Sequence, residues 1–329
     1  LMRKIRFGII GTGKIVHNFL DAALKHKEFE LTSVYSRDIN KAKEFGKPYG
    51  AKNFFDDLEE FSKCNEIDAV YIASPNFLHE SQSILCMNNK KHVLCEKPMA
   101  SNSKEVSRMI KASKDNGVLL MEAMRLTVLP NFLKVKENLN KIGKIRRYFA
   151  SYCQYSSRYD SFKEGVVLNA FNKDLSNGAL MDIGVYCIHP MINLFGKPNK
   201  VISNSVFLSN GIDGEGSVIF NYDDFDGIIM YSKISNSNLP LEIQGEDGSM
   251  LISNIHFEDV KIIYRDGREE KISIEPLKND MYYEIDEFIR CIKNGQLESK
   301  LNSLNNSLSA IELMDEIRKE IGLKFPADK

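Results

Sequence analysis

The sequence predicts an α/β domain with a doubly wound parallel sheet, followed by an α+β domain with a large, open, mostly antiparallel sheet. Three features support this. The turn Gly11-Thr12-Gly13 links an apolar strand to a helix, strands and helices alternate up to residue 121, and later strand-like runs follow one another with few helices between them. We therefore expect one domain over residues 1–121 and a second over residues 122–329.

Composition excludes several classes of function. Net charge is −1, so no global field attracts nucleic acid or an anionic membrane surface. The basic run Lys144-Ile145-Arg146-Arg147 is better explained as a solvated face. No apolar run approaches the ~20 residues of a membrane span, and no secretory signal opens the chain. We expect neither a nucleic-acid partner nor membrane association.

The 6 cysteines are scattered without the spacing of metal ligands. They predict free thiols in a reducing cytoplasm and no metal site. Met2 is expected to be the natural first residue, with Leu1 as an added one.

The glycine turn is the first candidate ligand site. An apolar strand, Ile5 to Ile10, precedes it, and a helix with one apolar face follows. In this context the candidate contacts are Gly11, Thr12, Gly13, Lys14 and Ile15. Glycines there let a pyrophosphate approach the first amides of the helix, as in a Rossmann domain. The third glycine of that fingerprint is Val16 here, so a plain glycine turn is the structural alternative.

The end of the second strand, Leu31 to Tyr35, bears on the choice of cofactor. An acid at this position would bind the ribose 2′-hydroxyl of NAD, whereas Ser36 and Arg37 suit the 2′-phosphate of NADP. Asp38 argues for NAD, but it occupies the N-cap position of the next helix. We expect NADP, with NAD as the alternative.

Two further strands end in polar residues at the same sheet edge. After Asp68 to Ala73 come Ser74, Pro75 and Asn76, which are expected to flank the nicotinamide half of the cofactor. His79 follows on a helix, and the alternative for it is purely local hydrogen bonding.

The run Val93 to Cys95 is the other strand, buried on both faces, and it ends in Glu96 and Lys97. Pro98 restricts Lys97 to an extended conformation and directs its amine outward. The structural alternative is an ordinary surface Glu–Lys pair. A helix from Ser103 to Asn116 and a strand from Val118 to Met121 complete the first domain.

Past residue 121 the pattern changes to a helix from Pro130 to Leu139, then successive strands, and two closing helices. The expected strands are Arg147 to Tyr155, Val201 to Leu208, Gly216 to Tyr222, Gly227 to Ile234, Leu241 to Gln244, Met250 to Ser253, Val260 to Tyr264 and Lys271 to Ile274. The closing helices are Tyr282 to Lys293 and Leu304 to Ile321. One face of such a sheet must be covered, and self-association is the usual means.

A second candidate set lies in the later domain. Asp182 and Tyr186 are four residues apart and share one face of a helix. Pro190 cannot donate an amide to the carbonyl of Tyr186, so we expect a kink or a helix start there. The structural alternative is a core tyrosine and a capping aspartate. His189 is a rival base, but its register and its place before Pro190 indicate a structural histidine.

Several stretches together resemble the Gfo/Idh/MocA oxidoreductases, in particular their dimeric dihydrodiol dehydrogenase branch. They are G-T-G-K-I, S-R-D, I-A-S-P-N-F-L-H, L-C-E-K-P-M, M-E-A-M, G-A-L-M-D-I-G-V-Y-C and the closing F-P-A-D-K. The resemblance covers essentially the whole chain. It implies NAD(P)-dependent hydride transfer with a sugar or cyclic diol, a homodimer or higher homo-oligomer, and a cis Lys97–Pro98 bond.

The resemblance also implies that Lys97, Asp182 and Tyr186 are catalytic, with Tyr186 where the family more often has histidine. Unperturbed tyrosine has a pKa of ~10 against ~6.5 for histidine. Tyr186 therefore needs a nearby cation to lower its pKa, and Lys97 is the candidate. Asp182 is expected to orient the substrate or the lysine. Glu96 would lie beside the cofactor.

One departure from the similar branch affects specificity. Where that branch has tryptophan, this chain has Arg125, and it contains no tryptophan at all. A cation in the pocket would favour a sugar, polyol or carboxylated substrate over an aromatic diol. We thus predict an NADP-preferring oxidoreductase acting on a small polyhydroxylated substrate. The alternatives are a non-enzymatic NAD(P)-binding regulator on the same fold and a methyltransferase.

Overall fold

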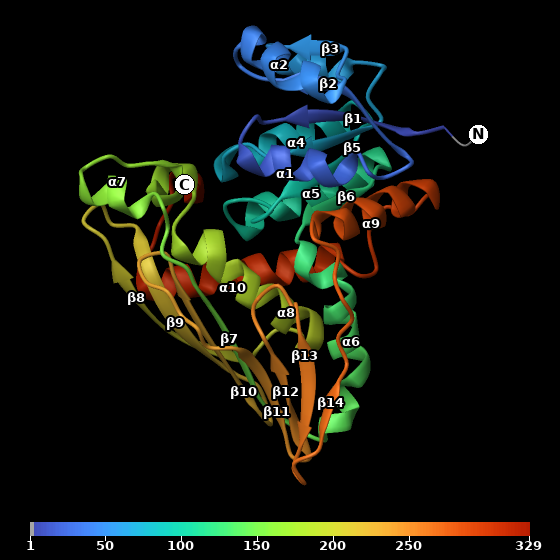
Figure 1. Cartoon of the computed structure of the whole chain (residues 1–329). Helices are drawn as coiled ribbons and strands as arrows, with labels where there is room; N and C mark the ends of the chain where they lie inside the picture. The colour runs from blue at the N-terminus through green and yellow to red at the C-terminus, as the bar shows by residue number, and fades with distance from the viewer. Residues whose placement is uncertain (1–2) are drawn as a thin grey trace. The chain divides into compact units, whose positions relative to one another are not determined.

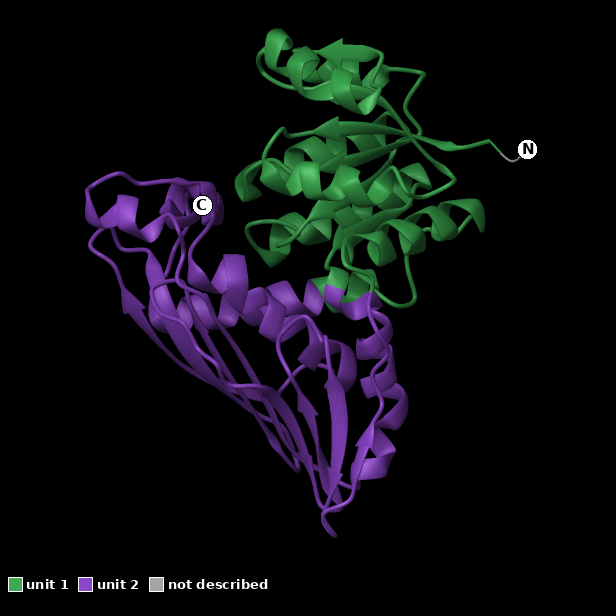
Figure 2. Ribbon diagram, in the orientation of Figure 1, with its two compact units in different colours: residues 1–125, 277–307 green, residues 126–276, 308–329 purple. Residues whose placement is uncertain are grey.

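The computed structural model describes residues 3–329, so the expectation about Leu1 and Met2 lies outside it (Figure 1). The chain divides into two compact units. Residues 1–125 with 277–307 form the first, and residues 126–276 with 308–329 form the second (Figure 2). The expected division into a cofactor-binding domain over residues 1–121 and a second domain over residues 122–329 stays a prediction. The first unit differs from it in including a stretch from near the end of the chain.

Within the described residues, the first unit contains a six-stranded parallel sheet of order β3-β2-β1-β4-β5-β6. Its strands are β1 (Ile5–Ile10), β2 (Phe29–Tyr35), β3 (Asn53–Phe55), β4 (Ala69–Ile72), β5 (His92–Glu96) and β6 (Leu120–Ala123). Its helices are α1 (Lys14–Ala23), α2 (Ile39–Gly46), α3 (Leu58–Lys63), α4 (His79–Asn88), α5 (Ser103–Asn116) and α9 (Met281–Lys293).

This architecture confirms the doubly wound parallel sheet. Strand β3 and helix α3 were not predicted, because elements of 3 and 6 residues are too short to show a period. Strand order reverses between β1 and β4, and ligands bind at the carboxyl ends of the strands at such a switch point.

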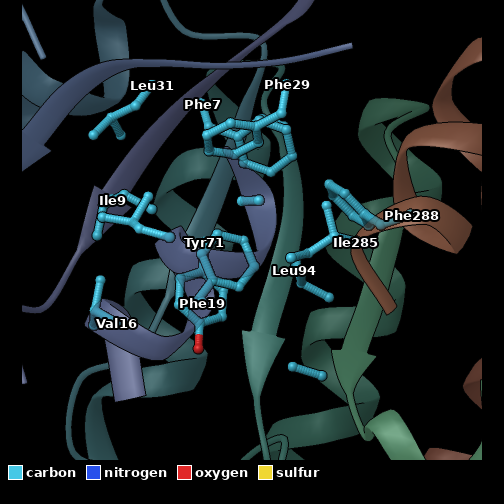
Figure 3. Packing of buried hydrophobic residues seen from close by; sticks show 14 of the residues in the cluster. Phe7, Ile9, Val16, Phe19, Phe29, Leu31, Tyr71, Leu94, Ile285 and Phe288 are labelled. Atoms are coloured by element: carbon cyan, nitrogen blue, oxygen red, sulfur yellow. The ribbon is translucent and has the colours of Figure 1, made fainter. Parts of the chain in front are cut away.

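Aromatic and aliphatic side chains together form the core of the first unit (Figure 3). Phe19 of α1 stacks on Tyr71 of β4 with ring centroids 3.7 Å apart. Phe288 of α9 lies against Phe7 of β1 at 5.9 Å. Phe19, Tyr71, Phe288 and Phe7 are all fully buried. Helix α9 therefore belongs to this core, although it follows the second sheet in sequence.

The second unit, all of whose residues are described, contains an eight-stranded sheet of order β14-β13-β12-β11-β7-β10-β9-β8. Its strands are β7 (Ile145–Cys153), β8 (Lys200–Phe207), β9 (Asp213–Asn221), β10 (Asp226–Ser232), β11 (Leu241–Gly245), β12 (Gly248–Ile252), β13 (Val260–Tyr264) and β14 (Glu269–Lys271). Its helices are α6 (Pro130–Asn138), α7 (Tyr159–Lys163), α8 (Val185–Phe195) and most of α10 (Leu304–Ile321).

Pairing in this sheet is antiparallel except between β7 and β10. The prediction of a mostly antiparallel sheet is therefore confirmed. Helix α8 packs against β7 and β10, where the hydroxyl of Tyr148 donates to the carbonyl of Cys187 at 2.8 Å. In residues 3–329, no helix combines the length and apolar character that crossing a membrane requires.

Candidate active site

The glycine turn adopts the geometry of a phosphate-binding loop. Gly11 has a φ of +114°, and a Cβ there would lie 2.7 Å from the carbonyl oxygen of Ala73. Gly13 is the N-cap of α1, and a Cβ placed on it would meet nothing within 4 Å. The first turn of α1 carries no acid and includes Lys14 and Ile15. Open space at the start of a helix without a side-chain cap or an acid in its first turn fits an anionic pyrophosphate.

The end of β2 separates the roles of Arg37 and Asp38. The carboxylate of Asp38 accepts hydrogen bonds from the amides of Asn40 at 2.9 Å and Lys41 at 3.4 Å, so Asp38 caps α2. Arg37 is exposed, and Ser36 lies partly exposed beside it. Because Asp38 is engaged by the cap, the donors at this position are those that suit a phosphate.

His79 contacts the backbone of the loop after β4. The Ser74 hydroxyl donates to Oε1 of Gln82 at 2.6 Å, and Pro75 and Asn76 remain partly exposed. His79 is 1% exposed, and its ring nitrogens lie 2.9 Å from the carbonyl oxygen of Pro98 and 2.8 Å from that of Ser74. Burial lowers the pKa of His79. His79 therefore connects the loops after β4 and β5, and its expected contact with the cofactor stays a prediction.

Glu96 and Lys97 differ sharply in exposure. Glu96 is buried, and it accepts hydrogen bonds from the Tyr71 hydroxyl at 2.6 Å and the Lys97 amide at 3.2 Å. Lys97 is the only residue of 93–102 that is not buried. The Lys97–Pro98 bond is cis, as the resemblance implied. A surface Glu–Lys pair is therefore excluded, because the acid lies in the core and the lysine alone reaches outward.

Helix α9 adds a second buried acid to this edge of the first unit. Glu284 is 1% exposed, and neither of its carboxylate oxygens has a hydrogen-bond partner among the described residues. Burial, and then the charge of Glu96, raise the pKa of Glu284 well above its ordinary value. Burial also raises the pKa of Glu96, against the opposing effects of Tyr71 and the nearby charges.

Arg125 is the positive partner of this acidic cluster. Its guanidinium donates to Asp280 at 3.1 Å, and its charge acts on both Glu96 and Glu284. About a fifth of each side chain of the Arg125–Asp280 pair is exposed. The expected contact of Arg125 with substrate stays a prediction, and its observed role is that of a counter-ion.

Asp182 and Tyr186 belong to the second unit and lie on its helix. A π-helical turn, Leu180–Gly184, carries Asp182, and Tyr186 follows in the first turn of α8. In residues 178–192 these two alone are not buried. Both side chains are therefore partly exposed, whereas their neighbours on these two helical segments are buried. π-Helical turns occur frequently at functional sites.

The structure gives Asp182 a partner that the sequence did not predict. Lys233, directly after β10, donates from Nζ to the carboxylate of Asp182. The structural alternative for Asp182, a cap, does not describe this contact. His189 is 1% exposed and lies in the core of the unit, consistent with a structural histidine.

Two sequence signals were available for the missed residues. Lys233 follows directly after an apolar strand. Glu284 lies on the apolar face of α9 with Met281, Ile285 and Phe288. A charged residue on a face that must be buried indicates a partner, but periodicity does not identify that partner.

The predicted residues thus fall into two groups. The candidate cofactor contacts follow β1, β2, β4 and β5 at the carboxyl edge of the parallel sheet in the first unit, whereas Asp182 and Tyr186 lie in the second unit.

Comparison with known proteins is consistent with this division. An oxidoreductase family with an NAD-binding Rossmann fold matches residues 5–124, and the GFO/IDH/MocA C-terminal domain matches residues 132–251. The chain is 55% identical over 326 residues to scyllo-inositol 2-dehydrogenase (NADP(+)) IolU of Bacillus subtilis, covering 99% of each chain.

Two further relatives are more distant. The trans-1,2-dihydrobenzene-1,2-diol dehydrogenase of Danio rerio is 30% identical, with 98% of this chain and 99% of that protein covered. The 3-ketoreductase KijD10 of Actinomadura kijaniata, solved with NADP and TDP-benzene, superposes with a TM-score of 0.86 at 22% identity. That match covers 97% of this chain and 98% of the ketoreductase and shows the shared fold.

Replacing Glu284 with glutamine is expected to stabilise the protein more at pH 8 than at pH 5. The folded state raises the pKa of Glu284 above its ordinary value of 4.5, so it holds the proton more tightly than the unfolded chain. The free energy of unfolding therefore falls as pH rises from the unfolded-state pKa of Glu284 toward its higher folded-state pKa. Glutamine removes the loss, and we expect the gain to differ between the two pH values by ~1 kcal/mol or more.

Urea unfolding of the full chain at each pH measures this difference. Glu44→Gln, at an exposed position on α2, is the matched control. An equal effect of Glu284→Gln at both pH values would contradict the raised pKa.

Proposed function

Because this chain belongs to the Gfo/Idh/MocA family of oxidoreductases, we propose that it interconverts a cyclic polyol of the inositol type and the corresponding ketone with NADP. It is an NADP(H)-dependent enzyme acting on CH–OH groups of a sugar, polyol or cyclic diol. The alternatives of a non-enzymatic regulator and a methyltransferase are therefore set aside. The observation that carries the specific proposal is the 55% identity to IolU over the whole chain.

The residues of the first unit fit NADP. Gly11 and Gly13 leave room for a pyrophosphate at the start of α1, where amides and dipole favour negative charge. Exposed Arg37, with Ser36, would hold the 2′-phosphate, since Asp38 is engaged as a cap. Ser74, Pro75 and Asn76 would flank the nicotinamide half. When bound, the cofactor supplies the acceptor or donor of the hydride.

We assign the proton chemistry to Lys97 and Tyr186. The Tyr186 hydroxyl would take the proton of the reacting hydroxyl group in oxidation and return it in reduction. The Lys97 ammonium would polarise the substrate oxygen and supply the positive charge that tyrosine needs to act near neutral pH. The Asp182 carboxylate would accept hydrogen bonds from hydroxyl groups of the polyol and so orient its ring. The polar ends of these three side chains match a substrate rich in hydroxyls.

We also propose that the protein self-associates through the open face of its large sheet. Ile202 of β8 pairs with Ile219 of β9, and Ile219 pairs with Ile228 of β10, so three isoleucines cross three strands on one face. Ile202 is 53% exposed and Ile219 46%. Exposed apolar surface of this kind favours association. The expected cytoplasmic location stays a prediction, supported by six free cysteines.

Arg37→Ala is expected to weaken NADPH binding about 10-fold or more and to leave NADH binding nearly unchanged, because it removes charge-assisted bonds to one phosphate. Fluorescence titration with each nucleotide measures both affinities. Lys43→Ala, at an exposed position later on α2, is the control. If the unaltered protein bound NADH more tightly than NADPH, Asp38 would be the residue that contacts the ribose. If it bound neither nucleotide, the proposal would be refuted.

Tyr186→Phe should lower turnover of scyllo-inositol with NADP by about 10²–10⁴-fold while NADPH still binds, because only the acid/base hydroxyl is lost. Tyr264→Phe, on β13, is the matched control. Turnover close to that of the unaltered enzyme would remove Tyr186 from the mechanism.

Sedimentation velocity of the full chain is expected to show a dimer or larger species rather than a 37.5 kDa monomer. Ile219→Lys should shift the distribution toward monomer, because it puts a charge on an apolar contact surface. Leu24→Lys, at a 49% exposed position on another part of the chain, should not. A monomer at all concentrations for the unaltered protein would refute self-association.

A further inference from the structure

Lys233 is a buried lysine that is held at several points. It is 4% exposed, and its Nζ lies 5.6 Å from the ring centroid of Phe171. Its amide donates to the carbonyl of Gly214 at 2.9 Å, and its own carbonyl accepts from the amide of Ser156 at 2.9 Å. Backbone and side chain are both fixed, so its ammonium occupies a defined position under Asp182.

The pair that Lys233 forms with Asp182 is asymmetric. The side chain of Lys233 is 5% exposed and that of Asp182 is 29% exposed. The ammonium therefore approaches the carboxylate from the protein side, and the carboxylate presents its other side to the surface. A lysine buried this far is rare without an ionic partner.

Another acid near Lys233, Asp213, is buried but does not replace Asp182 as the partner of the ammonium. Asp213 is fully buried, and its carboxylate accepts a hydrogen bond from the amide of Leu180 at 2.7 Å. Burial raises the pKa of Asp213 to about 7, against the backbone amides and the charge of Lys233. Asp213 anchors the start of the π-helical turn, whereas Lys233 anchors the aspartate within that turn.

From this geometry we propose that Lys233 is a positioning residue of the substrate site, which fixes Asp182 as an oriented carboxylate for the hydroxyl groups of a polyol. The inference rests on the proposed function of Asp182 and Tyr186. Two adjacent hydroxyls of a cyclic polyol can donate to one carboxylate, and a fixed carboxylate then sets which ring carbon faces Tyr186, one helical turn further on. Without the ammonium, Asp182 would lose the cation that holds its carboxylate in this orientation, and the orientation of the ring would be less well defined.

Removing one partner of an ion pair destabilises a protein when it leaves a buried charge unpaired, but the side chain of Asp182 is 29% exposed, so water can solvate its carboxylate in the variant. Lys233→Met keeps an unbranched side chain that is one atom shorter and removes the charged ammonium group. We expect it to lower kcat/KM for scyllo-inositol by about 10²-fold, as misplacement of a bound substrate does, with NADPH affinity unchanged. Lys233→Arg, which keeps a cation, should recover part of the loss.

A double-mutant cycle tests whether Lys233 acts through Asp182. In an Asp182→Asn background, adding Lys233→Met should reduce kcat/KM by no more than about twofold, because the pair acts as one unit. Lys261→Met, which breaks the exposed pair between Lys261 of β13 and Glu269 of β14, is the control and should leave kcat/KM unchanged. Losses that multiply in the double variant, or a folded Lys233→Met enzyme with full kcat/KM, would overturn the proposal.

A crystal structure of Lys233→Met gives a readout that is independent of turnover. The Asp182 carboxylate should leave its present rotamer, and an unchanged carboxylate would overturn the inference. If Lys233→Met does not fold, the same comparison is made on Lys233→Arg, where the carboxylate should stay on the cation. An unaltered protein that binds NADPH but oxidises no cyclic polyol would instead refute the proposed function and leave the structural readout intact.

Discussion

Parallel strand pairing is the constraint on which the cofactor-binding half of this protein depends. Strands β1, β2, β4 and β5 run in one direction, so the segments that follow them share one edge of the sheet. Residues as far apart in sequence as Gly11 and Lys97 are thereby gathered beside the point where strand order reverses. The aromatic core under these strands, including Phe288 from α9, holds that edge in place.

Buried charge is the second organising feature. In the first unit, Glu96 and Glu284 lie in the core, and Arg125 with Asp280 forms the neighbouring ion pair. In the second unit, Lys233 lies under Asp182. Such groups are costly to desolvate and are seldom retained for stability alone. Glu96 interacts with the charge of Lys97, and Lys233 pairs with Asp182, so these buried groups act on the two charged residues for which we propose roles in the reaction.

Arg125 has a different environment in the structure from the one that the sequence comparison suggested. As a replacement for an aromatic residue, it suggested a cationic pocket wall. In the structure its guanidinium contacts Asp280 and neutralises part of a buried acidic cluster. The proposed preference for a hydroxyl-rich substrate therefore depends on the roles proposed for Asp182 and Tyr186 and on the similarity to an inositol dehydrogenase, and not on Arg125.

The sequence by itself determined the features that depend on local periodicity and turn chemistry. Strand β1, helix α5, the cap at Asp38 and the shared face of Asp182 and Tyr186 follow from spacing within a few residues. Motif order was also sufficient for the family. The tertiary structure decided what depends on long-range contact: the docking of α9 into the first core, the pairing of Arg125 with Asp280 across 155 positions, and that of Lys233 with Asp182 across 51. A periodic pattern shows that a charge is buried, but only the folded chain determines which distant group neutralises it.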